Sequence, residues 1–234
     1  MKYFPSSLRS NKFFLLIILM SISLSTQAAK RSAGPILKVT PEEAAIIHLL
    51  LERVDLSMDE VASFSSLQAS IEQVVSSQRQ EADDDKLVNI QLTEENIHNL
   101  LVFMQRVVFR GGGARQVNAI VEKAIALLPQ GDAFRVQTPL GPPKVELSLS
   151  LEERLFLRDK LQSIQISVPE LRLFLSVYDP LEVALLEAAE NKELVLRISE
   201  QGLAGLRTFI QRFELLGCEV KLVKHIQKRL EPLS

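Results

Sequence analysis

Apolar residues recur along the chain at two spacings, and stretches with one spacing alternate with stretches of the other. Four short segments alternate apolar and polar side chains, which is typical of half-buried strands. Those segments are residues 36–39, 88–92, 145–149 and 194–198. Between them, apolar residues lie three or four positions apart, as on amphipathic helices. The pattern predicts a mainly α-helical protein with a minor α+β component, in which a short β-strand precedes each group of helices.

Most of the expected helices begin with a recognisable capping sequence. A Ser or Thr side chain accepts a hydrogen bond from an amide of the first turn, and a Glu three residues later returns one. The complete pattern occurs at Thr40–Glu43, Ser57–Glu60, Ser150–Glu153 and Ser167–Glu170. At Thr93 and Ser199 the returning acid is replaced by Asn96 and Gly202, respectively. These sequences predict six helix starts, two of them with incomplete boxes.

Two apolar stripes predict long helices that end at glycines. One stripe runs from Ile97 to Val108 and the other from Leu203 to Leu216. Gly111–Gly113 and Gly217 follow these stripes, and glycine commonly ends a helix. A second apolar stripe follows each glycine, so we expect a helical hairpin behind each strand. The helix expected over residues 41–54 is apolar almost all round, which places it at the centre of its part of the fold.

The chain aligns with itself, which predicts a tandem duplication of these capped helical-hairpin units, each preceded by a short strand. At an offset of 110 residues, Glu60 aligns with Glu170 and Phe64 with Phe174. Further along, the offset becomes 106 residues. The aligned pairs there include Phe103 with Phe209, Gln105-Arg106 with Gln211-Arg212, and Gly111 with Gly217. The change of offset falls in the polar stretch 78–86, where a loop accommodates it at small entropic cost.

The repeat and the chain's punctuation predict four regions. A basic start, a short apolar run and the small-residue exit Thr26-Gln27-Ala28 indicate a cleavable signal peptide over residues 1–28. The first helical copy then covers residues 29–128, and the second covers residues 145–234. A Pro- and Gly-rich linker, residues 129–144, separates them. An uncleaved membrane anchor is the weaker alternative, because the apolar run is too short to cross a bilayer.

Charge and cysteine content exclude some protein classes. Loss of residues 1–28 removes three positive charges and moves the formal charge from −2 to −5, which does not suit a nucleic-acid-binding protein. The only cysteine, Cys218, cannot form a disulfide within the chain, so we expect packing to supply the stability. Cys218 could still join two chains in an oxidising compartment, and a homodimer is one possible assembly.

The search for catalytic and metal-binding residues found little. The chain has no nucleophile elbow, paired-His zinc motif or phosphate-binding glycine loop. His48, His98 and His225 align with Arg158, Ala204 and Ala119, so ordinary surface histidines are favoured over metal ligands. The acidic run 81–85 lacks the spacing of a calcium loop. We therefore predict no catalytic residue, no metal site and no cofactor.

The candidate binding residues are arginines and glutamines near the two glycine turns. They are Arg106, Arg110, Arg115, Arg212, Gln105 and Gln211. The fork of an Arg side chain suits a carboxylate, and Arg106 and Arg212 could line one groove between the copies. The alternative is that each of these two arginines makes a structural ion pair with an early helix acid such as Glu94 or Glu200, which is the favoured interpretation.

These observations favour an exported helical repeat protein that acts as a protein-binding or scaffolding module, without evident catalytic activity. Its partner would be another exported or envelope protein. One alternative is an envelope hydrolase whose carboxylates converge only in the fold. Another is a periplasmic carrier for a peptide or small anion that uses the groove between the copies. The sequence does not separate a periplasmic from a secreted location.

Overall fold

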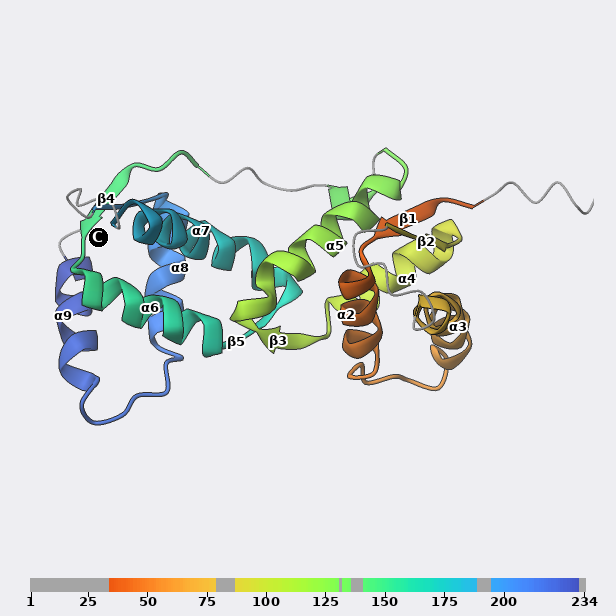
Figure 1. The fold of residues 1–234 in the computed structure, drawn as a ribbon, viewed down its shortest axis with the longest axis horizontal. Helices are drawn as coiled ribbons and strands as arrows, with labels where there is room; N and C mark the ends of the chain where they lie inside the picture. The colour runs from red at the N-terminus through yellow and green to blue at the C-terminus, as the bar shows by residue number, and fades with distance from the viewer. Residues whose placement is uncertain (1–33, 79–86, 131, 136–140, 189–194, 232–234) are drawn as a thin grey trace, which may run out of the picture. The chain divides into compact units, whose positions relative to one another are not determined.

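The computed structural model describes residues 34–78, 87–130, 132–135, 141–188 and 195–231, which Figure 1 draws as a coloured ribbon. Within these ranges the protein is mainly helical, with short antiparallel strands. The described residues from Pro35 onward belong to one compact unit. The predicted signal peptide and the acidic run 81–85 lie outside the described residues.

The first half of the described chain alternates strands and helices. Its elements are β1 (Ile36–Val39), α2 (Pro41–Leu51), α3 (Val61–Gln78), β2 (Val88–Gln91), α4 (Glu94–Met104), β3 (Val108–Arg110), the 3-10 turn η1 (Gly111–Gly113), α5 (Ala114–Leu127) and the 3-10 turn η2 (Ala133–Arg135). Strands β1 and β2 form an antiparallel pair in which Ile36 lies opposite Gln91.

The second half follows a similar order (Figure 1). Its elements are β4 (Val145–Ser148), α6 (Leu151–Ser163), β5 (Gln165–Ser167), the 3-10 turn η3 (Val168–Glu170), α7 (Leu171–Ala188), β6 (Val195–Ile198), α8 (Glu200–Ile210) and α9 (Val220–Leu230). Strands β4 and β6 pair antiparallel, with Val145 opposite Ile198. A third antiparallel pair, β3 with β5, joins the two halves.

The helix starts form as the capping sequences predict. At α2, Thr40 Oγ1 accepts a hydrogen bond from the Glu43 amide, and the Glu43 carboxylate accepts one from the Thr40 amide at 2.8 Å. Ser150 and Glu153 make the same reciprocal bonds at α6. The four predicted strand segments are also confirmed in their described residues, with alternating burial such as the Leu37 and Val39 side chains inward.

The structure corrects the ends of the long helices. Helix α4 ends at Met104 and α8 at Ile210, whereas the apolar stripes predict helix as far as Val108 and Leu216. Val108 instead begins strand β3, and Leu216 lies in the loop before α9. The chain leaves the helix because residues 108–110 pair with β5, a contact more than 50 residues away in sequence that a local spacing rule does not detect.

Gly111 begins a turn rather than ending a helix. An added Cβ at Gly111 would lie 2.1 Å from the Leu161 carbonyl oxygen and 2.7 Å from the Phe174 ring. A side chain there would collide with α6 and α7, so the close approach of η1 to the second half requires glycine.

The helix over Pro41–Leu51 is less enclosed than its composition predicts. Its Ala44, Ile47, Leu50 and Leu51 side chains are buried, yet Leu49 is 52% exposed. The helix also ends three residues before the predicted end. One apolar face of α2 therefore remains open to solvent.

Phe103 and Phe209 are core residues, with 2% and 1% of their surfaces exposed. Phe103 packs edge-on against Phe64, and Phe209 packs edge-on against Phe174, with ring centroids 5.5 and 5.6 Å apart. The hydrophobic core is continuous through both halves. In the second half it also encloses Arg154, whose guanidinium donates to the carbonyl oxygens of Ala184 and Leu149.

Replacing Phe103 or Phe209 with Ala should lower the free energy of unfolding by about 3–5 kcal/mol, because each change leaves a cavity in the core. Urea denaturation followed by circular dichroism measures the loss. Leu186→Ala is the matched control, since Leu186 is 73% exposed, and should change stability by no more than about 0.5 kcal/mol. A similar small change at Phe103 or Phe209 would contradict the assignment of that ring to the core.

Candidate functional site

The candidate site is centred on the β3–β5 pair. Val108, Phe109 and Arg110 lie opposite Ser167, Ile166 and Gln165, respectively. The Gly111 amide continues the pairing by donating to the Ile164 carbonyl at 2.9 Å. Phe109 and Ile166 are buried, whereas Val108, Arg110 and Gln165 are exposed. The pair therefore presents one face to the core and one to solvent.

The register determines which backbone groups remain available. Hydrogen-bonded and non-hydrogen-bonded residue pairs alternate in an antiparallel ladder. Because Gly111 bonds to Ile164, Phe109 and Ile166 form the next hydrogen-bonded pair. Val108 and the amide of Arg110 consequently point away from β5. The outer edge of β3 thus offers a donor and an acceptor at Val108 and a further donor at Arg110.

An open groove of about 610 Å³ lies beside β3. Helix α2 contributes Ile46, Leu49, Leu50 and Arg53 to its lining; β3 contributes all three of its residues, and Gly113, Val117 and Gln165 complete it. Arg53 and Arg110 are both exposed, and no acidic residue lines the groove. The result is a mainly apolar surface with two positive charges. Sequence reasoning missed this groove, although the excess of apolar residues in the helix over 41–54 was a signal for it.

A second, more polar cavity of about 600 Å³ is lined from both halves of the chain. Its lining residues are Arg110, Ser163, Ile164, Gln165, Arg212 and Glu214. The carrier hypothesis expects Arg106 and Arg212 to share a groove. Arg212 instead shares this cavity with Arg110, so two of the candidate arginines are brought together, though not the pair the hypothesis names.

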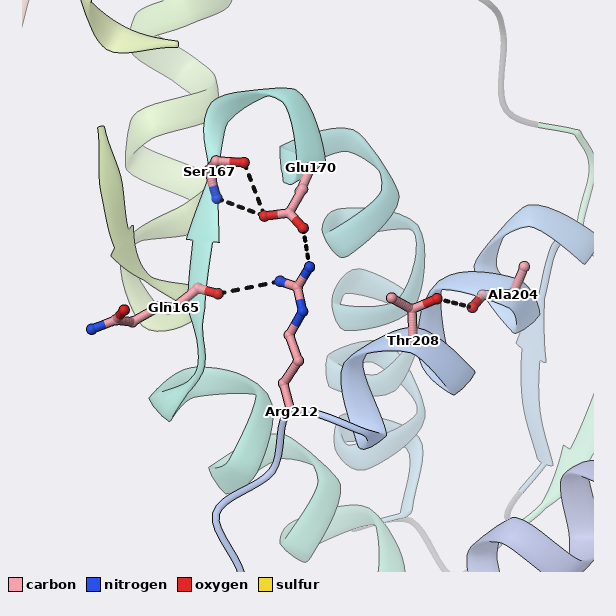
Figure 2. A network of polar contacts seen from close by, with 6 residues as sticks. All are labelled: Gln165, Ser167, Glu170, Ala204, Thr208 and Arg212. Atoms are coloured by element: carbon pink, nitrogen blue, oxygen red, sulfur yellow. Dashed lines mark hydrogen bonds and ion pairs between the residues drawn. The ribbon is translucent and has the colours of Figure 1, made fainter. Parts of the chain in front are cut away.

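Arg212 is held by an acid at a helix start, as Figure 2 shows. Its guanidinium donates to Glu170, and the Glu170 carboxylate also accepts bonds from the amide and hydroxyl of Ser167, both at 2.9 Å. A second donor of Arg212 reaches the Gln165 carbonyl at 3.4 Å. Arg212, followed by Ser167, holds the pKa of Glu170 at about 2, below its ordinary value of 4.5. The Arg212 guanidinium also lies over the Phe209 ring.

Arg106 makes the corresponding contacts in the first half. It binds Glu60 through two nitrogens, at 2.9 and 2.5 Å, and Glu60 accepts bonds from the amide and hydroxyl of Ser57. These bonds, led by that from Arg106, hold the pKa of Glu60 at about 2. Arg106 lies over Phe103 at 5.8 Å. The expected ion pairs therefore exist, but their acids are Glu60 and Glu170 rather than the suggested Glu94 and Glu200.

The remaining candidate residues have separate surroundings. Arg115 on α5 donates to Asp179 at 2.8 Å and lies over the Tyr178 ring, so it ties the two halves together. Gln105 lines a cavity of about 330 Å³ whose walls include Val168 and Pro169 of the second half. Gln211 lines a cavity beside α9. The two glutamines are thus not brought to one place.

The histidines and the cysteine form no cluster. His48 lies 3.5 Å from Glu52, as the one-turn spacing suggests, and 3.8 Å from Glu72. Among the described residues, no group of three or more His, Cys, Asp or Glu side chains is placed to hold a metal ion. Cys218 is an exposed free thiol.

The carboxyl groups with clearly shifted pKa values are all more acidic than usual. In the described part of the chain these are Glu60, Glu170 and Glu219, the last lowered chiefly by a hydrogen bond from Lys160. A general acid needs the opposite shift, because it must hold its proton near neutral pH. These three carboxylates are suited to ion pairing.

No family model, curated protein or solved structure is significantly similar to this chain. None of the helices in the described ranges is long and apolar enough to cross a membrane. The function must therefore be argued from the geometry alone.

Stability should fall in acid because protonation of Glu60 and Glu170 breaks both arginine pairs. Their folded pKa values lie near 2, below the ordinary value of 4.5, so their contribution is present above about pH 4.5 and is lost as the pH falls towards 2. Urea midpoints measured between pH 2 and pH 7 should fall in that window. The Glu60→Gln/Glu170→Gln variant should show a shallower fall, whereas Glu95→Gln, at an exposed acid of α4, should follow the wild type. Parallel curves for all three proteins would contradict this account.

Proposed function

We propose that this protein is an exported module, built from two tandem copies of one helical unit, that binds an extended segment of another exported or envelope protein. The observation that carries the proposal is the groove beside β3, where an unpaired strand edge adjoins an apolar helix face. Export rests on the signal sequence predicted for residues 1–28.

The duplication is supported by two ion pairs that recur at aligned positions. Glu43 and Glu153 each complete a capping box, and each binds a base on the last helix of its half, Lys123 at 2.6 Å and Arg229 at 3.5 Å. The pairs of Arg106 with Glu60 and Arg212 with Glu170 recur in the same way. Each pair joins residues from the two sides of the change in offset. Chance agreement of side chains at four such positions is a poor explanation.

The aligned region of the second copy supports a binding role for the groove of the first. There Lys160 and Glu219 form an ion pair at 2.7 Å, and Lys160 also donates to the Glu214 carbonyl. These three residues align with Leu50, Gly113 and Val108. The second copy thus satisfies the outward carbonyl with its own lysine, whereas the first copy has apolar and glycine residues and leaves its edge available.

The lining of the groove specifies the chemistry of its occupant. An extended chain can exchange backbone hydrogen bonds with Val108, and its alternate side chains then face the groove. Leu49 and Val108, each about half exposed, suit an apolar side chain. Arg53 and Arg110 suit a carboxylate. We therefore propose an extended segment that carries an apolar side chain and an acidic group.

Selection of short random peptides against the mature chain, residues 29–234, tests the proposal. Peptides with apolar and acidic residues should be enriched, and Leu49→Glu should weaken their binding by about tenfold or more, equivalent to about 1.4 kcal/mol. Leu186→Glu is the matched control, because Leu186 is an exposed leucine on α7, outside the groove lining.

A charge swap makes the test specific. The Arg53→Glu/Arg110→Glu variant should lose the acidic peptides and gain their counterparts in which Lys replaces the acid. Failure to enrich any peptide, or peptides that bind the Leu49→Glu variant as well as the wild type, would refute the groove as the binding site.

A small-anion carrier is the second candidate, and it is favoured by the polar cavity that Arg110 and Arg212 share. Calorimetric titration with inorganic phosphate or succinate should then show binding that Arg110→Gln abolishes. Arg53→Gln should leave it unchanged, because Arg53 lines the groove and not this cavity. Equal binding by both variants would exclude this cavity.

A further inference from the structure

The β3–β5 junction joins two segments, and each has an aligned counterpart that lies outside any strand. Residues 108–114 pack on residues 165–171 at the junction. Under the proposed duplication, residues 214–220 correspond to the first segment and residues 55–61 to the second. Both counterparts are described, and residues 55–57 and 214–216 form no strand. The chain therefore carries one half of the same junction at each of two sites.

Side chains that are buried at the junction are exposed at the counterparts. Ile166 is 1% exposed, whereas the aligned Leu56 is 37% exposed. The same difference holds for three further pairs, in which the first residue is buried and the second exposed: Phe109 and Leu215, Leu171 and Val61, and Ala114 and Val220. These four exposed residues form apolar surface that matches a contact the protein already makes once. Isolated exposed apolar residues are common, but a matched set indicates an interface.

Gly217 provides a second match. Gly111, with which it aligns, lies so close to Leu161 and Phe174 that no Cβ fits. Around Gly217 no atom lies within 4 Å of an added Cβ, so nothing in the described chain requires glycine there. Phe64, the counterpart of Phe174, is only partly buried, whereas Phe174 is 0% exposed. A second chain would bring Gly217 against Phe64 as Gly111 lies against Phe174.

The charges of the two surfaces are complementary at aligned positions. Lys221 corresponds to Arg115, which lies near Glu182 on α7, and Glu182 corresponds to Glu72. Lys224 corresponds to Asn118, which lines the same cavity as Pro169, and Pro169 corresponds to Asp59. A second chain docked in the geometry of the junction would thus place Lys221 near Glu72 and Lys224 near Asp59.

We propose that mature chains associate head to tail, with residues 214–220 of one chain packed on residues 55–64 of the next. The proposal rests on the duplication argued above. It is independent of the peptide groove, whose lining does not include these counterpart segments. Because the two surfaces differ, the contact is heterologous and builds a ring or an open filament rather than a symmetric dimer.

Disulfide trapping tests this contact with the thiol that the chain already has. An added Cβ at Gly112 lies 3.9 Å from the Cβ of Gln162, within the range of about 3.5–4.5 Å that disulfides require. Cys218 aligns with Gly112, and Glu52 aligns with Gln162. The Glu52→Cys variant should therefore form interchain bonds to Cys218 in oxidised glutathione, which is reduced as each pair of thiols is oxidised.

The pattern of products identifies a head-to-tail contact. Glu52→Cys should give a ladder of covalent oligomers on a non-reducing gel, because each chain carries both partners. A mixture of the Glu52→Cys/Cys218→Ser variant with wild type should stop at dimers joined between residues 52 and 218. Glu95→Cys, which retains Cys218, should give no ladder.

An intrachain variant separates the possible failures. Gly112→Cys/Gln162→Cys/Cys218→Ser should form a disulfide within one chain. If it does while Glu52→Cys gives no ladder, self-association is wrong and the internal junction stands. If neither bond forms, the junction geometry is wrong, and head-to-tail association fails with it.

Sedimentation of the unmodified mature chain provides a measurement without added cysteines. The average mass should rise above that of a dimer with concentration, and Leu56→Asp or Leu215→Asp should each return it to a monomer. Leu186→Asp, at an exposed leucine of α7, should not. A wild-type chain that stays monomeric at concentrations of several hundred micromolar would overturn the proposal.

Discussion

The arrangement around β5 depends on one carboxylate, that of Glu170. It accepts bonds from Ser167, which fixes the turn into α7, and it binds Arg212, which comes from the end of α8. Arg212 in turn reaches the Gln165 carbonyl of β5 and lies over Phe209 in the core. An exposed ion pair of this kind contributes little free energy by itself. Its importance is geometric, because a single side chain links a helix start, a strand and a helix end.

The strand that Glu170 and Arg212 hold in place also forms both candidate binding surfaces. Gln165 lines the mainly apolar groove and the polar cavity, and so does Arg110 opposite it. Moving β5 would therefore alter both surfaces together. Gly111 imposes the second constraint, since only glycine allows η1 to approach Leu161 and Phe174. The candidate sites thus depend on a junction that is fixed by one ion pair and one missing side chain.

Sequence patterns predicted the features whose signals are local. Capping boxes such as Thr40 with Glu43 and the alternation in the strand over Ile36–Val39 involve neighbouring residues, and the structure confirms both. Strands β3 and β5 are only three residues long and pair across more than 50 residues, so no local period marks them. The same limit explains the ion pairs: Glu94 is close to Arg106 in sequence, yet the partner is Glu60, 46 residues away. Arg154 was also missed, because a buried arginine that binds only carbonyl groups looks like any surface arginine in a helix.

The difference between the two grooves is the best guide to function that the molecule offers. Under the proposed duplication, Lys160 and Glu219 show how the unit can close this surface with its own side chains. The first copy has Leu50 and Gly113 at those positions, and half-exposed Leu49 and Val108 beside them. Stability does not require this arrangement, because apolar surface left in contact with water forgoes the free energy of burial. An occupant that covers the surface would recover that free energy, so a binding role accounts for residues that folding alone does not.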